Sequence, residues 1–281
     1  MDKYYIGILP ELNFRFLVAN CSNTIQEIID KQGLKYSSAD IVAKTTLGAF
    51  FLAAMVKDDA NVSIQLEGNG EVERVLAYSD KYGKLRAVAH KKEVVASMSD
   101  PTLGIGTGVI KVNRWRGSTH DRQSLTELVD DSFENNLLQY IYQSEQVPSY
   151  LHTYLGNQDA KALVGGFIFQ ALPEATVEEK KLMQEKVQVF FAGIDAFFQG
   201  DLQETFSKLP ETLDTELQVL QEGTPQYNCV CDMEKIKRIV RSMGREEADS
   251  IIQDVGKVEL TCEFCVKKFS LDAEEVHLLF M

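Results

Sequence analysis

Two tight pairs of cysteines lie near the end of the sequence, Cys229-Val230-Cys231 and Cys262-Glu263-Phe264-Cys265, with the 30 residues 232–261 between them. Sulfurs this close in sequence can reach one metal ion at about 2.3 Å, and the intervening chain folds back to bring the two pairs together. Zinc suits soft thiolate ligands, and four of them leave no position open for a substrate water. The pattern predicts one tetrahedral Zn²⁺ per chain, bound by Cys229, Cys231, Cys262 and Cys265, and no hydrolytic chemistry.

Other interpretations of these cysteines stay open at this point. A static zinc site that only stabilises a small domain is the first, and an iron–sulfur cluster is the second, although cluster motifs usually group three cysteines closely. Two structural disulfides conflict with a reduced cytoplasm. A thioredoxin-like enzyme built on Cys262 and Cys265 requires a surrounding βαβ unit, which the sequence does not suggest.

The chemistry of such a site also permits a redox switch. A region of about 50 residues has little core of its own, so metal binding would supply much of its folding free energy, ~10–16 kcal/mol in zinc-finger peptides. Metal-bound sulfur is already thiolate, the form that oxidants attack. Oxidation to disulfides would remove the ligands and release the metal. The region would then lose its structure, and thiol reductants could reverse the reaction.

The bulk composition is that of a folded globular protein. The chain has 281 residues, 44% hydrophobic and 25% charged, which is enough for two domains or one domain with appendages. A formal net charge of -13 disfavours nucleic-acid binding. No secretory leader is apparent, and the most apolar stretch, residues 47–56, is about half the ~20 residues that span a bilayer. We expect a cytoplasmic protein that binds no membrane.

The fold class predicted from these patterns is α+β, beginning with a mixed α/β core domain over residues 1–175. Helical character over 41–56 is followed by a hairpin that pairs 72–77 with 84–89. A capping box at Ser124-Leu125-Thr126-Glu127 predicts the start of a helix that ends before Pro148. Residues 165–170 predict a further strand.

Two more regions complete the predicted organisation. An all-helical linker over 176–228 opens with a capping box at Thr176-Val177-Glu178-Glu179. Its apolar residues recur at three- and four-residue intervals, which indicates an amphipathic helix with an aromatic face. These residues are Met183, Val187, Phe190, Phe191, Ile194, Phe197 and Phe198. A small zinc-binding domain over 229–281 follows.

Motifs throughout the chain carry a family resemblance. The cysteine arrangement, together with Arg241-Ser242-Met243-Gly244-Arg245-Glu246-Glu247 and Phe269-Ser270-Leu271-Asp272-Ala273-Glu274-Glu275, resembles the redox-regulated chaperones of the heat shock protein 33 family. Two distant segments are similar to that family as well, Tyr142-Gln143-Ser144-Glu145-Gln146-Val147-Pro148-Ser149 and Gly165-Gly166-Phe167-Ile168-Phe169-Gln170-Ala171-Leu172-Pro173. The resemblance spans nearly the whole chain.

The resemblance implies an oxidation-activated holdase, not an enzyme. In this family the reduced, zinc-bound form is inactive. Oxidants such as hypochlorite, or peroxide with heat, form one disulfide within each pair and release zinc. On this chain the implied disulfides are Cys229–Cys231 and Cys262–Cys265. The alternatives that remain are a static zinc-stapled protein-binding module and a thiol–disulfide oxidoreductase.

The same resemblance implies the partners of the protein. After activation the zinc region and the helical linker lose structure, apolar surface is exposed and the protein dimerises. It then binds unfolding client proteins under oxidative stress without ATP and passes them to ATP-dependent foldases. The aromatic face of the linker fits a client surface that is masked before activation, although ordinary packing against the first domain also explains it.

A few remaining signals are assigned no functional role. Cys21 is predicted to be a small buried apolar residue. Gly104, Gly106 and Gly108 precede a predicted strand at 109–112, so they form a turn and not a phosphate loop. His277 lies near the cysteines, but four thiolates already complete the site. No spacing in the sequence suggests a catalytic centre.

Overall fold

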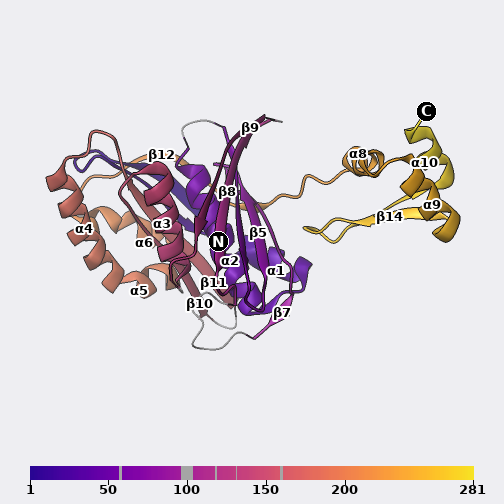
Figure 1. The fold of residues 1–281 in the computed structure, drawn as a ribbon. Coiled ribbons are helices and arrows are strands. Elements are labelled where there is room, and N and C mark those ends of the chain that lie inside the picture. Colours follow the sequence, from indigo (N-terminus) through magenta and orange to yellow (C-terminus); the bar gives the residue numbers. More distant parts are fainter. Residues whose placement is uncertain (57–58, 96–103, 118, 131, 159–160) are drawn as a thin grey trace. The chain divides into compact units, whose positions relative to one another are not determined.

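A computed structural model describes residues 1–281 except 57–58, 96–103, 118, 131 and 159–160 (Figure 1). The chain divides into two compact units, Met1–Tyr227 and Asn228–Met281. The class is mixed α and β, as the sequence predicts.

Two sheets form the framework of the first unit. One has five antiparallel strands in the order β10 (Ser149–Gln158), β11 (Lys161–Ala171), β2 (Phe14–Asn20), β1 (Lys3–Leu9) and β12 (Gln218–Gly223). The other has six strands, in the order β13 (Gln226–Tyr227), β6 (Lys84–Ala89), β5 (Arg74–Ser79), β4 (Asn61–Gly68), β8 (Gly108–Arg116) and β9 (Thr119–Glu127). The two-residue strands β3 (Lys35–Tyr36) and β7 (Glu93–Val94) pair separately.

The first of the two hydrophobic cores of this unit surrounds helix α2 (Ser37–Ala54). Buried residues such as Leu47 and Phe50 occur on every side of this helix, and it contacts strands of both sheets. A helix that is apolar all round is stable in water only when it is enclosed in this way. Helices α1 (Ser22–Gln32) and α3 (Phe133–Glu145) complete this core. In the described parts of the chain, no helix has the length and apolarity needed to cross a bilayer.

The second core lies on the other face of the five-stranded sheet. Successive side chains of a strand point to opposite faces, and in β2 Leu17 belongs to the first core whereas Phe16 and Val18 belong to the second. Four helices cover this second face: α4 (Val177–Ala192), α5 (Ile194–Gln199), α6 (Leu202–Ser207) and α7 (Leu209–Leu213). The sheet is therefore buried on both sides, which explains the nearly continuous apolar runs of β2 and β11.

Several local predictions are confirmed. The helical stretch 41–56 lies in α2 except for its last two residues, and the predicted hairpin is β5 paired with β6. Residues 165–170 are part of β11, and 109–112 are part of β8. The capping box at the start of α4 is formed: the Thr176 hydroxyl accepts a hydrogen bond from the Glu179 amide at 3.2 Å, and the Glu179 carboxylate accepts one from the Thr176 amide at 2.7 Å.

The prediction of an all-helical linker over 176–228 is wrong at its carboxyl end. Residues 218–223 form β12, which pairs with β1, and residues 226–227 form β13, which pairs with β6. The side chains of β12 are mostly exposed, so its sequence carries no alternation of buried and exposed residues. Backbone hydrogen bonds to an edge strand create this element, and periodicity does not reveal them.

The prediction that a helix begins at Ser124 is also wrong. Residues 119–127 are strand β9, because β8 offers backbone partners from Val109 to Arg116, with a register shift between Arg114 and Trp115. The α3 helix begins later, at Phe133, where the hydroxyl of Ser132 accepts a hydrogen bond from the Asn135 amide at 3.3 Å.

The second unit is small. It contains α8 (Met233–Met243), α9 (Arg245–Val255), the antiparallel hairpin of β14 (Lys257–Thr261) and β15 (Lys268–Asp272), and α10 (Ala273–Leu279). Its core has seven buried apolar residues: Ile236, Val240, Ala248, Val258, Phe269, Leu271 and Val276. A core of this size contributes little folding free energy.

The close packing of α5 on β11 gives a first testable prediction. A Cβ atom on Gly165 would lie 2.5 Å from a ring carbon of Phe198 and 2.9 Å from the Ala19 carbonyl oxygen. Gly165→Ala should therefore destabilise the first unit by roughly 1–3 kcal/mol, because overpacking forces neighbours apart. The measurement is urea unfolding followed by fluorescence of Trp115, the single tryptophan of the chain, which lies in the first unit.

Gly193→Ala is the matched control for this change. A Cβ there meets only an ordinary contact, 3.9 Å from the Phe190 carbonyl oxygen, and its φ is -108°. Equal unfolding midpoints for the two variants would contradict the packing described for Gly165.

Candidate metal centre

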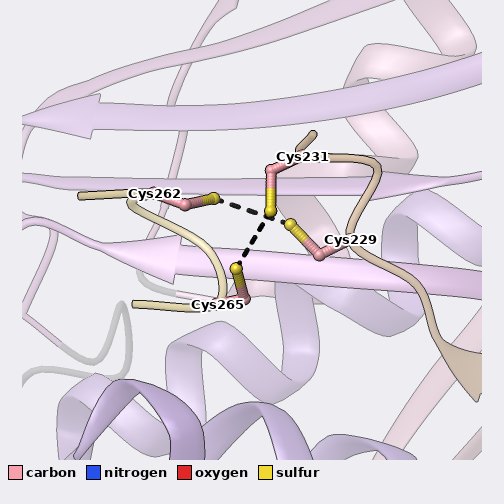
Figure 2. A group of neighbouring side chains, drawn as sticks. All are labelled: Cys229, Cys231, Cys262 and Cys265. Atoms are coloured by element: carbon pink, nitrogen blue, oxygen red, sulfur yellow. Dashed lines mark hydrogen bonds between the residues drawn. The ribbon is translucent and has the colours of Figure 1, made fainter. Parts of the chain in front are cut away.

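The four predicted cysteines meet in the second unit (Figure 2). Cys229 and Cys231 lie in the irregular segment before α8, whereas Cys262 and Cys265 lie in the turn between β14 and β15. All four Sγ atoms are within 4.8 Å of one another. Close contacts join the two pairs: Cys231 Sγ is 3.2 Å from Cys265 Sγ, and Cys229 Sγ is 3.6 Å from Cys262 Sγ.

This arrangement fits a single tetrahedral ion. Ligand bonds of about 2.3 Å at tetrahedral angles place sulfurs about 3.8 Å apart, which is within the range of the observed separations. The four residues are partly buried, and Cys231 and Cys262 pack against the small core. The cluster could hold a metal ion, and its four sulfurs are a soft donor set.

The hairpin turn is shaped by its own backbone. The Cys262 amide donates to the Lys267 carbonyl at 2.9 Å, and the Val266 amide donates to the Cys262 carbonyl at 2.9 Å. These bonds fold the chain so that Cys265 turns back toward Cys262. On the other side of the site, the Asp232 carboxylate accepts a hydrogen bond from the Lys235 amide at 2.7 Å. This N-cap begins α8 directly after Cys231.

The electrostatics of the four thiols differ. Burial raises the pKa of Cys231, and neighbouring thiols, that of Cys265 first among them, raise it further. Burial also raises the pKa of Cys229. At Cys265 burial opposes ionisation, but the Lys267 backbone N–H and the surrounding thiols donate hydrogen bonds to its sulfur and lower its pKa to about 7. A bound cation would favour the thiolate form of all four sulfurs.

Other candidate residues lie outside this cluster. Cys21 is fully buried in the first core, where burial raises its pKa well above the usual value, so its prediction as a small apolar residue is confirmed. His277 is exposed, with Nδ1 3.4 Å from a guanidinium nitrogen of Arg245. The group of thiols that could hold a metal does not include it.

Two features of the site could not be predicted from the sequence. The backbone donor at Lys267 depends on the exact turn geometry. Val266 has a φ of 58°, a left-handed conformation that a β-branched residue rarely adopts. A glycine at 266 would have signalled this turn, whereas a valine suggests an extended chain.

The fold and the site together define a class of protein: a mixed α/β unit followed by a small unit organised around four thiols. A family model described as "Hsp33 protein" matches residues 2–272, so the chain belongs to the Hsp33 family.

Two relatives show the extent of the sequence similarity. The "33 kDa chaperonin" of Thermodesulfovibrio yellowstonii is 25% identical over 285 residues, which cover 99% of both chains. The protein of the same name from Lactococcus lactis subsp. cremoris is 25% identical over 289 residues, again with 99% of both chains covered.

The fold has a solved counterpart. The crystal structure of a 33 kDa chaperonin, the heat shock protein 33 homolog of Thermotoga maritima, matches 99% of this chain and 97% of its own with a TM-score of 0.80. The sequence identity between the two is 22%.

The strained turn gives a second prediction. A left-handed conformation costs a non-glycine residue about 1–2 kcal/mol, and glycine gives back about 0.5–1 kcal/mol of that through its larger loss of entropy. Val266→Gly should therefore stabilise the second unit by up to roughly 1 kcal/mol. The measurement is hydrogen exchange of the α8 and β14 amides in the metal-loaded protein, and the exchange should be slower in the variant.

Val230→Gly is the control, since Val230 is similarly exposed, lies between two of the same cysteines and does not have a positive φ. Val230→Gly should speed hydrogen exchange in the second unit, because glycine loses more entropy on folding and there is no left-handed conformation to relieve. Faster exchange in both variants would show that the turn at Val266 carries no strain.

Proposed function

We propose that this protein is a redox-regulated holdase chaperone. Its reduced form binds zinc and is inactive, and oxidation releases the metal and activates the binding of unfolding proteins. The observation that supports this most directly is the meeting of four thiols within 4.8 Å in a unit with only seven buried apolar residues. The names of the relatives, 33 kDa chaperonins, support the chaperone assignment.

The metal in this proposal is one Zn²⁺, bound by Cys229, Cys231, Cys262 and Cys265. Four sulfurs suit zinc and leave no coordination position for a substrate, so the ion would be structural. Zinc would hold both cysteine segments against the small core. Because that core is weak, removal of the ion would remove most of the folding free energy of residues 229–281.

Oxidation acts on the same sulfur atoms. We assign the disulfides to Cys229–Cys231 and Cys262–Cys265. For each pair, two thiolates give two electrons to one peroxide molecule; an S–S bond forms, the O–O bond breaks, and two protons complete two water molecules. A disulfide sulfur is a poor ligand, so the metal leaves.

In the folded unit the Cys231 sulfur lies 3.2 Å from that of Cys265 and the Cys229 sulfur 3.6 Å from that of Cys262, which makes crossed disulfides the competing outcome. Pairing within each pair is favoured once the unit opens, because the shortest loops close at the smallest entropy cost. Peptide mapping of the oxidised protein distinguishes the two patterns.

The proposed domains are a core over 1–175, a linker over 176–228 and a redox-switch domain over 229–281. The helices α4–α7 of the linker cover an aromatic sheet face: Phe206 stacks on Tyr5 with ring centroids 3.9 Å apart, and Phe190 packs on Phe167 at 5.0 Å. Release of the linker would expose rings on both sides of this contact, which is the apolar surface that unfolding clients require.

The cellular setting follows from this activity. We propose a cytoplasmic protein of the oxidative stress response that dimerises on activation. Since holding a client needs no ATP, release would depend on ATP-dependent foldases that refold it.

The experiment that tests the function is light scattering of a thermally unfolding client protein. Protein oxidised with peroxide at elevated temperature should suppress aggregation, and the reduced, zinc-loaded sample should not. A dithiol reductant should restore the inactive state. Equal behaviour of both samples would instead indicate a static zinc module, and turnover of dithiol substrates would indicate an oxidoreductase.

A cysteine variant tests the metal site separately. Cys262→Ser should weaken zinc binding and destabilise residues 229–281, because serine replaces a soft thiolate by a hydroxyl. Zinc content per chain and hydrogen exchange of β14 are the measurements. The matched control is Cys21→Ser, which alters a cysteine of the first core and should leave zinc content at one per chain. Unchanged tight binding in Cys262→Ser would exclude the four-sulfur site.

A further inference from the structure

A strand with no fully buried side chain covers the β1 side of the five-stranded sheet. β12 lies outside β1 and pairs with it antiparallel, with Tyr4 opposite Gly223 and Ile8 opposite Gln218 (Figure 1). The register shifts between Ile6 and Gly7, so the pairing contains an irregularity. On its other side β1 pairs with β2 through an unbroken register.

The side chains of β12 contribute little to its attachment. Val219 is 43% exposed and Leu220 is 62% exposed, and no residue of the strand is fully buried. The Gln221 amide is the main side-chain anchor, donating to the Tyr4 hydroxyl at 2.8 Å and to the Lys81 carbonyl at 3.1 Å. Backbone hydrogen bonds therefore supply most of what holds β12 on the sheet.

The edge that β12 covers is apolar on both faces. Tyr4 and Ile6 belong to the first core, whereas Tyr5 and Leu9 belong to the second. A strand of this kind with an open edge would present unpaired backbone groups between apolar side chains. Such edges readily accept another extended chain, so folded proteins normally protect them.

We infer that β1 is a docking edge for client proteins, and that β12 is an internal strand that occupies it until activation. This inference rests on the proposed function, in which the region 176–228 loses structure. An extended apolar segment of an unfolded protein would then add to β1 as the outermost strand of the sheet. It would replace the backbone hydrogen bonds that β12 made.

The chemistry of strand addition suits an unfolded partner. Main-chain hydrogen bonds are the same for every sequence, so they allow binding of many different clients. Alternate side chains of the added strand would lie beside Tyr5 on one face and beside Tyr4 and Ile6 on the other. Segments with apolar residues on both faces, which are typical of buried strands, would bury more apolar surface there than the exposed side chains of β12 do.

Hydrogen exchange of the full-length protein tests this placement. In the reduced, zinc-loaded state the amides of residues 3–9 should be protected. Oxidation should raise exchange at the β1 amides that face β12, and addition of a chemically unfolded client should protect them again by at least tenfold. Persistent protection of the β1 amides that face β12 after oxidation, or exchange there that the client does not alter, would overturn the inference.

A peptide with the sequence of β12 tests whether β12 and the client compete for the same edge. A fluorescent peptide with the sequence of residues 215–226 should bind the oxidised protein, not the reduced protein, and an excess should release the client. The control peptide carries Val219→Pro and Gln221→Pro, which abolish strand pairing and should weaken binding at least tenfold. Equal competition by both peptides would show that strand pairing is not involved.

These results separate the two proposals. If the oxidised protein holds its client while the peptide has no effect, only the docking edge is wrong. If the oxidised protein holds no client at all, the proposed function fails and the docking edge fails with it.

Discussion

The meeting of four sulfur atoms at one point is the constraint on which the second unit depends. Its helices and its single hairpin enclose a small core, and two of the four cysteines, Cys231 and Cys262, pack against that core. One cysteine segment precedes α8 and the other joins β14 to β15, so whatever holds the sulfurs together also closes the chain between them. A metal ion would do this with four bonds, whereas a hydrophobic core of this size contributes little folding free energy.

The first unit is stabilised differently. Its five-stranded sheet is buried on both faces, with α2 on one side and the helices α4–α7 on the other. The two faces differ in how they are built. α2 is enclosed between the strands of two sheets, but α4–α7 form an outer layer with exposed residues such as Val177 and Val189 along it. Removal of this outer layer would leave the first core and most sheet pairing in place, which is what a reversible switch requires.

The order of elements along the chain places the sheet-covering segments next to the cysteines in sequence. β12 and β13 come directly after the helical layer and directly before Cys229, so the segment that covers one sheet face continues into the strand that covers the sheet edge and then into the thiol cluster. The two segments are attached in different ways. The helices bury apolar and aromatic side chains in the second core, whereas β12 is held by backbone hydrogen bonds, the Gln221 amide and an ion pair between Lys3 and Glu222.

Much of this protein could be predicted from the sequence alone, because the relevant signals are local. The close spacing of the cysteines and the capping box at Thr176 act within a few residues, and the structure contains both. The apolar period of residues 183–198 is buried as expected for its larger part, but the predicted single helix is divided at Gly193 into α4 and α5. Tertiary structure decided the rest. The capping pattern at Ser124 is overridden because β8 supplies a strand partner, and β12 exists only because β1 has an open edge. The left-handed turn at Val266 and the amide that lowers the pKa of Cys265 arise from hairpin closure. In each case the deciding hydrogen bonds come from the fold around the segment, so the residues of the segment alone could not reveal them.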